Sequence, residues 1–253
     1  MARVDLRASK LSFAYPDGTH SLEGCDLVVR EREKWALIGP NGAGKTTLLL
    51  LADGLLRPAS GAIEVLGSAL SNPREMVEIR KRVGFLFQNP DDQLFCTTVL
   101  EEVLFGPLNH DLPPEVARAR ADAALRSAGL EGYEKRVPQH LSGGEKRKVA
   151  VASVLSMEPE LLLFDEPTND LDPRGRVEIL QLLENMPLTM LIATHDYELV
   201  LRVCSHVALM NRGRVAASGP ADKILADKEL LEAGGLVQPE WLPYLLKGNG
   251  AVG

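Results

Sequence analysis

The chain has 253 residues, of which 45% are hydrophobic and 25% charged, and its formal net charge is −7 at pH 7. This composition is ordinary for a globular protein with one substantial core, and the acidic balance argues against a groove that binds nucleic-acid phosphates. The chain has no run of 18 apolar residues and no signal segment at its start, so we expect a cytosolic protein that cannot itself form a membrane pathway. Three cysteines without metal-ligand spacing predict a reduced compartment and no zinc site: Cys25, Cys96 and Cys204.

The hydrophobic pattern predicts an α/β fold. Two segments that alternate apolar and polar residues, Val4–Ala8 and Leu27–Glu31, predict antiparallel strands with one solvent-exposed face. A helix is predicted from Pro113 to Gly129, where proline and glycine occupy their expected end positions. Four segments that are apolar on both faces alternate with helical stretches and predict a parallel core sheet: residues 35–38, 83–87, 161–164 and 189–193.

A glycine-rich segment, the phosphate loop, follows the first apolar strand and leads into a helical pattern. Glycines let the backbone wrap closely round a phosphate chain, and the amide hydrogens of such a loop point at the anion. Lys45 is then placed to bridge the β- and γ-phosphates, and the Thr46 hydroxyl to hold a magnesium ion. The alternative is a strand-to-helix turn without a ligand, and the flanking elements favour phosphate binding. The residues of the loop are Gly39, Pro40, Asn41, Gly42, Ala43, Gly44, Lys45, Thr46 and Thr47.

Two acids follow the strand at 161–164. Ligands of open α/β sheets bind at the carboxyl ends of the strands, where Asp165 and Glu166 are expected to lie. Asp165 is suited to hold magnesium, while Glu166, on the opposite face of the strand, is suited to orient or deprotonate a water molecule. Either acid alone would be unremarkable as a solvated residue at a strand end.

The segment Leu141–Glu145, with the sequence Leu-Ser-Gly-Gly-Glu, begins another helical pattern. Ser142 and Glu145 have capping-box spacing, which is enough to explain both. Two consecutive glycines weaken a helix by about 1 kcal/mol each, so Gly143 and Gly144 are better explained by close approach of the backbone to a second anion. The basic residues 146–148, one turn further on, could form a solvated face or a patch that faces ATP, and we interpret them as mostly a solvated face.

Together these residues resemble the ATP-binding cassette (ABC) family, over nearly the whole chain from about Leu6 to Gly219, and Leu141–Glu145 is similar to that family's signature sequence. The resemblance implies a P-loop NTPase core with a mostly parallel sheet, an antiparallel β subdomain and an inserted α-helical subdomain at about residues 90–160. The nucleotide-binding domain would span residues 1–226, with a short C-terminal extension at 227–253 that packs on the body or on a second copy. The implied activity is hydrolysis of ATP with Mg²⁺.

The resemblance also assigns roles across a dimer of ATPase subunits. Lys45, Gln88, Glu166 and His195 would be catalytic, with His195 as the switch histidine. Thr46, Gln88 and Asp165 would hold the metal. Tyr15 would stack on the adenine of the nucleotide bound to its own subunit. Ser142, Gly143 and Gly144 of the other subunit would contact the γ-phosphate of that nucleotide. Asp172 would belong to the dimer-contacting loop Asn169–Asp172. Simpler structural readings remain: Tyr15 packing over the turn at Pro16–Gly18, and Asp172 capping a helix that begins at Pro173.

The string from Gln88 to Phe95, Gln-Asn-Pro-Asp-Asp-Gln-Leu-Phe, is similar to ATPases of energy-coupling factor (ECF) importers, which take up vitamins and transition metals, and overall similarity favours the cobalt/nickel branch. The implied partners are a second ATPase subunit, an integral membrane coupling protein and a membrane substrate-binding protein, and no nucleic-acid partner is expected. A homodimer is possible because one chain carries every motif. The implied location is the cytoplasmic face of the cell membrane, as a peripheral protein.

Other functions stay open from the sequence. A surface turn explains the composition around Gln88 equally well, and a cassette ATPase of another importer or of an exporter would have the same nucleotide chemistry. Cassette proteins of nucleic-acid repair would insert a coiled coil, but residues 47–141 contain no sustained heptads. Cassette proteins of translation would carry two cassettes. A small-molecule P-loop kinase would need neither the signature segment nor His195.

Overall fold

The structure is a computed structural model and describes residues 3–70 and 73–249. Its central sheet has six strands in the order β10–β9–β3–β8–β7–β6, all parallel except β10, which pairs antiparallel with β9 at the edge. The mostly parallel core sheet is therefore confirmed, although no sequence pattern had indicated its last two strands. The strands are β3 (Lys34–Ile38), β6 (Val83–Leu86), β7 (Leu161–Asp165), β8 (Thr189–Ala193), β9 (His206–Asn211) and β10 (Arg214–Pro220).

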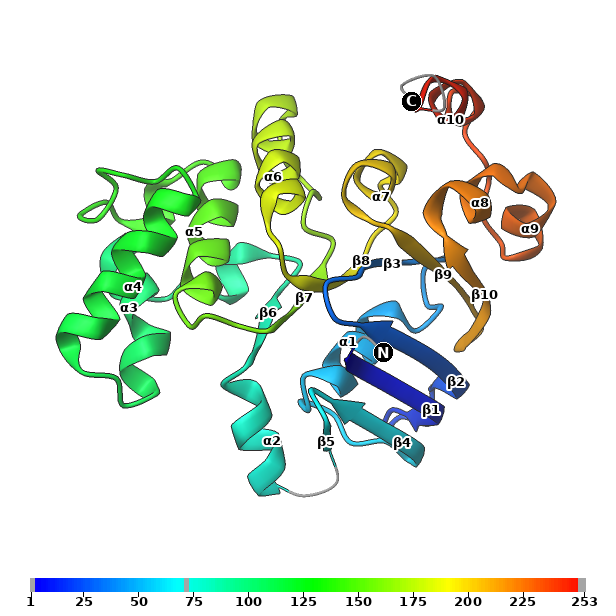
Figure 1. Cartoon of the computed structure of the whole chain (residues 1–253), viewed down its shortest axis with the longest axis horizontal. Helices are drawn as coiled ribbons and strands as arrows, with labels where there is room; N and C mark the ends of the chain where they lie inside the picture. The colour runs from blue at the N-terminus through cyan, green and yellow to red at the C-terminus, as the bar shows by residue number, and fades with distance from the viewer. Residues whose placement is uncertain (1–2, 71–72, 250–253) are drawn as a thin grey trace.

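A second, antiparallel sheet has the order β2–β1–β4–β5 and confirms the predicted antiparallel subdomain (Figure 1). Its first two strands are longer than the segments predicted from alternation, because β-bulges let each strand continue past breaks in the pattern. The strands are β1 (Val4–Ala14), β2 (His20–Arg30), β4 (Ser60–Val65) and β5 (Ser68–Ala69).

The hydrophobic core has two parts, one on each face of the central sheet. Alternation along β3 sends Trp35 and Leu37 into the part shared with the antiparallel sheet and with helix α1 (Lys45–Ala52). Ala36 and Ile38 point into the other part, which most of the remaining helices cover. Helix α1 thus lies between the two sheets and begins at the carboxyl end of β3.

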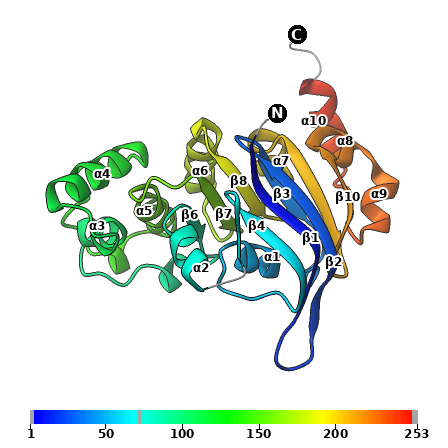
Figure 2. The same cartoon turned by 60° about the horizontal axis from the view of Figure 1, so that its bottom comes forward.

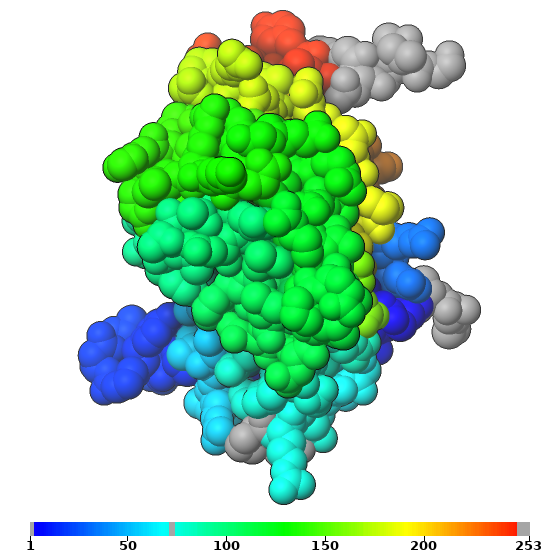
Figure 3. All heavy atoms as spheres, turned by 90° about the vertical axis from the view of Figure 1, so that its left-hand side faces the viewer, coloured from blue at the N-terminus to red at the C-terminus, as the bar shows by residue number. Residues whose placement is uncertain are grey.

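Three helices form a separate layer beyond β6: α3 (Val99–Asn109), α4 (Pro114–Ser127) and α5 (Gly143–Leu155) (Figures 1 and 2). Viewed from that side, these helices make up most of the visible surface (Figure 3). The predicted helix at 113–129 is α4. The predicted capping box at the start of α5 is confirmed, since Ser142 and Glu145 bond to each other's backbone N–H.

The other helices are α2 (Pro73–Arg80), α6 (Pro173–Asn185), α7 (Tyr197–Val203), α8 (Ala221–Ala226), α9 (Lys228–Ala233) and α10 (Leu242–Asn249). The last three lie at the end of the molecule opposite α3–α5 (Figure 1). Leu231 of α9 and Leu242 of α10 are fully buried in the main core, so the extension packs on the body of its own chain, and residues 250–253 lie outside the described part. Within that part, no helix combines the length and apolar character needed to cross a membrane.

Candidate functional site

One pocket of about 320 Å³ lies where the carboxyl ends of β3 and β7 meet the start of α1. Parallel strands end together at this edge, which explains why segments distant in sequence converge there. The pocket brings together most of the residues expected to bind nucleotide and metal. Its lining comprises Tyr15, Thr19, His20, Ser21, residues 41–47 of the phosphate loop, Gln88, Asp165 and Glu166.

The backbone of the phosphate loop is packed so closely that two of its glycines leave no space for a side chain. Gly39 has a φ of 151°, and a Cβ there would lie 2.2 Å from the carbonyl oxygen of Met210. Gly44 has a φ of 98°, and its Cβ would lie 2.6 Å from the carbonyl oxygen of Ser21. Any other residue at either position would push the loop away from its neighbours, so the loop shape depends on glycine.

Lys45 is the half-buried cation of this pocket. Its Nζ donates to the carbonyl oxygens of Gly39 (2.8 Å) and Pro40 (3.2 Å). Burial lowers the pKa of Lys45, while the charges of Glu166 and Asp165 act in the opposite direction. An ammonium group whose direct partners are neutral carbonyls is well suited to an anionic ligand, and the phosphates of a nucleotide fit this requirement.

The oxygen atoms of Thr46 and Asp165 meet at the floor of the pocket. Thr46 Oγ1 donates to Asp165 Oδ2 over 2.9 Å. Burial raises the pKa of Asp165, and the neighbouring charge of Glu166 adds to the effect. A hydroxyl paired with a carboxylate is the oxygen donor set that Mg²⁺ uses beside nucleotide phosphates, so these residues fit that ion.

Glu166 does not lie on the opposite face of β7 from Asp165, and that expectation was wrong. The strand ends at Asp165, and Glu166 takes a left-handed backbone conformation with a φ of 48°, its N–H donating to the carbonyl of Ala193. This turn breaks the alternation of the strand, so both carboxylates line the same pocket. Non-glycine residues rarely adopt such a backbone, and when they do it is often at a functional site.

His195 reaches this pocket through Glu166. Its Nδ1 lies 2.9 Å from Glu166 Oε2, and its backbone N–H approaches the same oxygen at 3.4 Å. The side chain is 69% exposed, so the other ring nitrogen is open to a further partner. A histidine bonded to a carboxylate in this way can hold the acid in place or exchange a proton with it.

Tyr15 both forms the predicted turn and lines the pocket. Its backbone bonds to Thr19 and Gly18, while its ring stands edge-on to Phe13 with centroids 4.9 Å apart. The Tyr15 hydroxyl lies 3.0 Å from Thr47 Oγ1, which ties the ring to the first turn of α1. The ring is therefore held beside the phosphate loop.

The signature segment Leu141–Glu145 contributes nothing to the described lining of this pocket. Ser142, Gly144 and Asp172 line a second cavity of about 370 Å³ between α5 and α6, and Gly143 lines another beside Gln88 and Asn169. A Cβ on Gly144 would lie 3.2 Å from the Cα of Gly175, so helix packing also accounts for this glycine. A single chain therefore holds the phosphate loop and the signature segment apart.

Asp172 has the capping role considered from the sequence. Its side chain accepts from the N–H of Gly175 (2.8 Å), and Pro173 occupies the first helical position of α6. This cap fixes the end of the loop Asn169–Asp172 to the start of α6.

Arg147 corrects the interpretation of residues 146–148 as a mostly solvated face. It is 2% exposed and donates to the carbonyl oxygens of Phe87 (2.7 Å) and Gln88, while its Nε is a buried nitrogen without a partner. Lys146 adds an ion pair with Asp91 at 2.7 Å. Helix α5 is thus bonded directly to the segment that carries Gln88.

Asp196 is a second residue that the sequence reasoning missed. It caps α7 and accepts from Thr168 Oγ1 (2.9 Å) and from Arg176 of α6 (2.7 and 2.9 Å). Burial alone would raise the pKa of Asp196, but the hydrogen bonds from Arg176 and from the helix backbone bring it below its ordinary value. The backbone beside His195 is therefore fixed to α6. An aspartate between an apolar strand and a helical segment is typical of such a cap.

The chain was compared with known protein families and structures. A family model described as ABC transporter matches residues 22–169. The energy-coupling factor transporter ATP-binding protein EcfA of Methanothermobacter thermautotrophicus is 44% identical over 240 residues, which cover 93% of this chain and 76% of the relative. EcfA of Methanocaldococcus jannaschii is 43% identical over 233 residues, covering 90% of this chain and 84% of the relative.

Solved structures give the same assignment. The structure of cbiO1 from Clostridium perfringens, described as part of the ABC transporter complex cbiONQ, superposes with a TM-score of 0.82 at 36% identity and covers 98% of this chain and 99% of that one. A dimeric ATP-binding cassette in a post-hydrolysis state, bound to ADP and Pi, superposes with a TM-score of 0.77 at 27% identity, covering 85% and 98%. The chain therefore belongs to the ABC transporter family, as an ATPase that couples ATP hydrolysis to transport.

Proposed function

We propose that the chain is the ATP-hydrolysing subunit of an ECF-type importer, and that two ATPase subunits close around two molecules of Mg²⁺-ATP. The observation that carries this proposal is the division of the site within one chain. The pocket of the phosphate loop contains Lys45, Asp165 and Glu166, whereas Ser142 lines a different cavity. A second subunit can supply the hydrogen-bond donors of Ser142 and its neighbours that this pocket lacks. The relatives named EcfA support the assignment to ECF-type transporters.

Different residues of the pocket bind the phosphates, the metal ion and the adenine of Mg²⁺-ATP. The phosphate loop, residues 39–47, binds the phosphates, and Lys45 neutralises the β- and γ-phosphates once it leaves its carbonyl partners. Thr46, Asp165 and Gln88 would hold Mg²⁺, which would supply positive charge next to the phosphates. Tyr15 stacks on the adenine.

Glu166 and His195 act on the water molecule. Glu166 orients it or accepts its proton, because its carboxylate lines the pocket while being held at a fixed place by the backbone turn. His195, bonded to the same carboxylate, keeps it oriented and senses the γ-phosphate. A carboxylate that already has one partner needs little reorganisation when substrate binds.

Closure of the dimer supplies the remaining contacts to the nucleotide. Ser142, Gly143 and Gly144 of the partner chain donate to the γ-phosphate, and the partner's loop around Asp172 packs beside the site. Moving an equilibrium from 1:99 to 99:1 requires about 5.5 kcal/mol of differential affinity, which several charge-assisted hydrogen bonds at two sites can provide. Hydrolysis removes this difference and lets the dimer reopen. One chain carries every motif, which favours a homodimer.

We propose that residues 1–226 form the nucleotide-binding domain, with residues 90–160 as its helical subdomain, and that residues 227–253 are an extension. The chain binds at the cytoplasmic face of the membrane through its partners.

An exposed aromatic surface is the proposed dock for a helix of the membrane coupling protein. It consists of Phe95 and Phe105, whose rings pack edge-on at 4.8 Å, and Phe95 is 62% exposed. Glu102 is buried and accepts from the N–H groups of Phe95 and Cys96, which holds this loop on α3. Apolar side chains that are exposed on a rigid support favour binding of another apolar surface.

The proposed cargo is a transition-metal ion, cobalt or nickel, with a vitamin as the alternative. This choice follows from the overall similarity of the sequence to the cobalt/nickel branch. Cargo would be recognised by the membrane substrate-binding protein rather than by this chain.

The test is purification from the source cell in detergent, followed by reconstitution in vesicles. We expect an integral membrane protein to co-purify, and ATP-dependent uptake of Co²⁺ or Ni²⁺ by the reconstituted complex. A Phe95→Asp variant should lose the membrane protein while keeping basal ATP hydrolysis. Uptake of a vitamin alone would exclude the metal cargo, and ATP-driven export would exclude the importer.

A further inference from the structure

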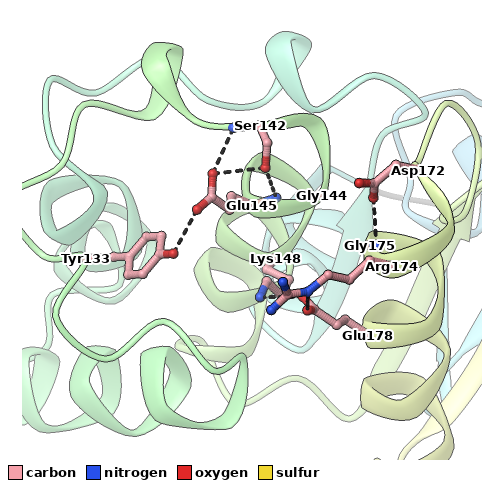
Figure 4. A pocket seen from close by; sticks show the side chains of 9 residues that line it. All are labelled: Tyr133, Ser142, Gly144, Glu145, Lys148, Asp172, Arg174, Gly175 and Glu178. Atoms are coloured by element: carbon pink, nitrogen blue, oxygen red, sulfur yellow. Dashed lines mark hydrogen bonds and ion pairs between the residues drawn. The ribbon is translucent and has the colours of Figure 1, made fainter.

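The cavity between α5 and α6 contains a short hydrogen-bond chain that ends on the hydroxyl group of Ser142 (Figure 4). Glu145 Oε2 accepts from both the N–H and the hydroxyl of Ser142, each at 2.9 Å. The hydroxyl of Tyr133 donates to the other carboxylate oxygen of Glu145 at 2.7 Å. Both polar hydrogens of Ser142 are therefore directed at one carboxylate.

That carboxylate is held in its charged form. Hydrogen bonds from Ser142 and Tyr133 lower the pKa of Glu145 below its ordinary value. The nearest cation is Arg136, 3.6 Å away and half exposed, and ion pairs of this kind contribute little in water.

The other two cations of the cavity have a different partner. Lys148 and Arg174 both pair with Glu178, at 2.9 and 3.0 Å. Figure 4 shows these three side chains meeting between α5 and α6, apart from Ser142 and Glu145. Both cations therefore bond to Glu178 rather than to Glu145.

Under the proposed function, Ser142 donates its hydroxyl proton to the γ-phosphate bound by the partner chain. One proton cannot serve both the phosphate and Glu145. Two anionic oxygens that flank one hydroxyl would lie roughly 4–6 Å apart, where like charges repel. We propose that Glu145 is a positioning residue that acts through Ser142: it opposes closure of the dimer and so raises the ATP concentration at which closure occurs. The inference rests on the proposed closure of two subunits around ATP.

The test replaces Glu145 by glutamine in a chain that also carries Glu166→Gln, so that hydrolysis does not interfere. Glutamine also suits the capping box, so the start of α5 is preserved while the charge is removed. We expect the half-maximal Mg²⁺-ATP concentration for dimer formation, measured by light scattering, to fall about 3- to 10-fold. A folding defect could not produce this gain.

Glu178→Gln is the matched control, because it makes the same change of charge in the same cavity but at a residue bonded to Lys148 and Arg174. It should shift the midpoint less than about twofold. Adding Ser142→Ala to the Glu145→Gln chain should remove the gain, because the hydroxyl is the group through which Glu145 acts.

With Glu166 intact, Glu145→Gln should lower the KM for ATP more than it changes kcat. An unchanged or raised midpoint overturns the inference, and so does an equal shift in the Glu178→Gln control. If the chain with Glu166→Gln alone does not dimerise at any ATP concentration, the proposed pairing fails and the inference falls with it. A normal ATP-driven dimer with no effect of Glu145→Gln overturns only the inference.

Discussion

Replacement of Arg147 by methionine should affect catalysis far more than folding. The guanidinium donates two hydrogen bonds to the carbonyl oxygens of Phe87 and Gln88, and bonds from a charged donor contribute about 1.5–3 kcal/mol each. The same group is 2% exposed and its direct partners are carbonyls, and removing such a charge from water costs several kcal/mol. These two contributions nearly cancel. We therefore expect Arg147→Met to change the free energy of unfolding by less than about 2 kcal/mol.

Catalysis has no such compensation, because Gln88 loses the contact that fixes its backbone. A displacement of about 1 Å at a catalytic site can cost about 10²-fold in rate, so kcat should fall about 10- to 100-fold. Arg147→Lys keeps the charge but lacks the planar fork that reaches two carbonyls, so its kcat should be intermediate.

Phosphate release at saturating ATP and urea denaturation measure the two quantities. A kcat of Arg147→Met within about twofold of the parent chain would show that the contact to Gln88 has no role in turnover. A loss of unfolding free energy above about 4 kcal/mol would show instead that the guanidinium stabilises the fold.

Substitutions at three further positions test the pocket and the core. Glu166→Gln should bind ATP normally, hydrolyse it about 10²–10⁴-fold more slowly and accumulate as a closed dimer in light scattering, and near-normal turnover would refute its assigned role. Tyr15→Ala should weaken ATP binding in nucleotide titrations by roughly 1–3 kcal/mol, whereas Tyr15→Phe should bind almost normally because it keeps the ring. Burial raises the pKa of Asp53 from 3.8 to about 7, so the folded chain holds a proton that the unfolded chain releases. Stability should then fall as pH rises from about 4 to about 7, by at most roughly 1.4 kcal/mol per pH unit, and stay level above that range. Asp53→Asn should abolish this slope in urea denaturation, and an unchanged slope would assign it to another group.

Local patterns were sufficient for much of the fold. The phosphate loop, the capping box at Ser142 and the apolar strands that end at Asp165 and Ala193 depend on short-range chemistry, and the structure contains all of them. Strands β9 and β10 were not predicted, although they form a local hairpin joined by Arg212 and Gly213. Only the pairing of β9 with β3 depends on residues far away in sequence.

The misplaced residues share one cause, which is that tertiary contacts overrode a local rule. Arg147 reads as a surface cation beside two lysines, but the carbonyls of the Gln88 segment give it buried acceptors. Glu166 should alternate with Asp165 along a strand, but the strand stops one residue earlier. The residue type of Glu166 does not show that the strand ends before it. The residue type of Arg147 does not show that carbonyl acceptors lie about 60 positions away in the sequence.

The left-handed backbone at Glu166 has a consequence for how this position evolves. A side chain in that conformation costs roughly 1–2 kcal/mol, a penalty that glycine would not incur. Selection for thermal robustness alone would thus favour glycine, and only selection for turnover retains the acid. Stabilised descendants of this chain should for that reason be checked for activity whenever substitutions arise at this turn.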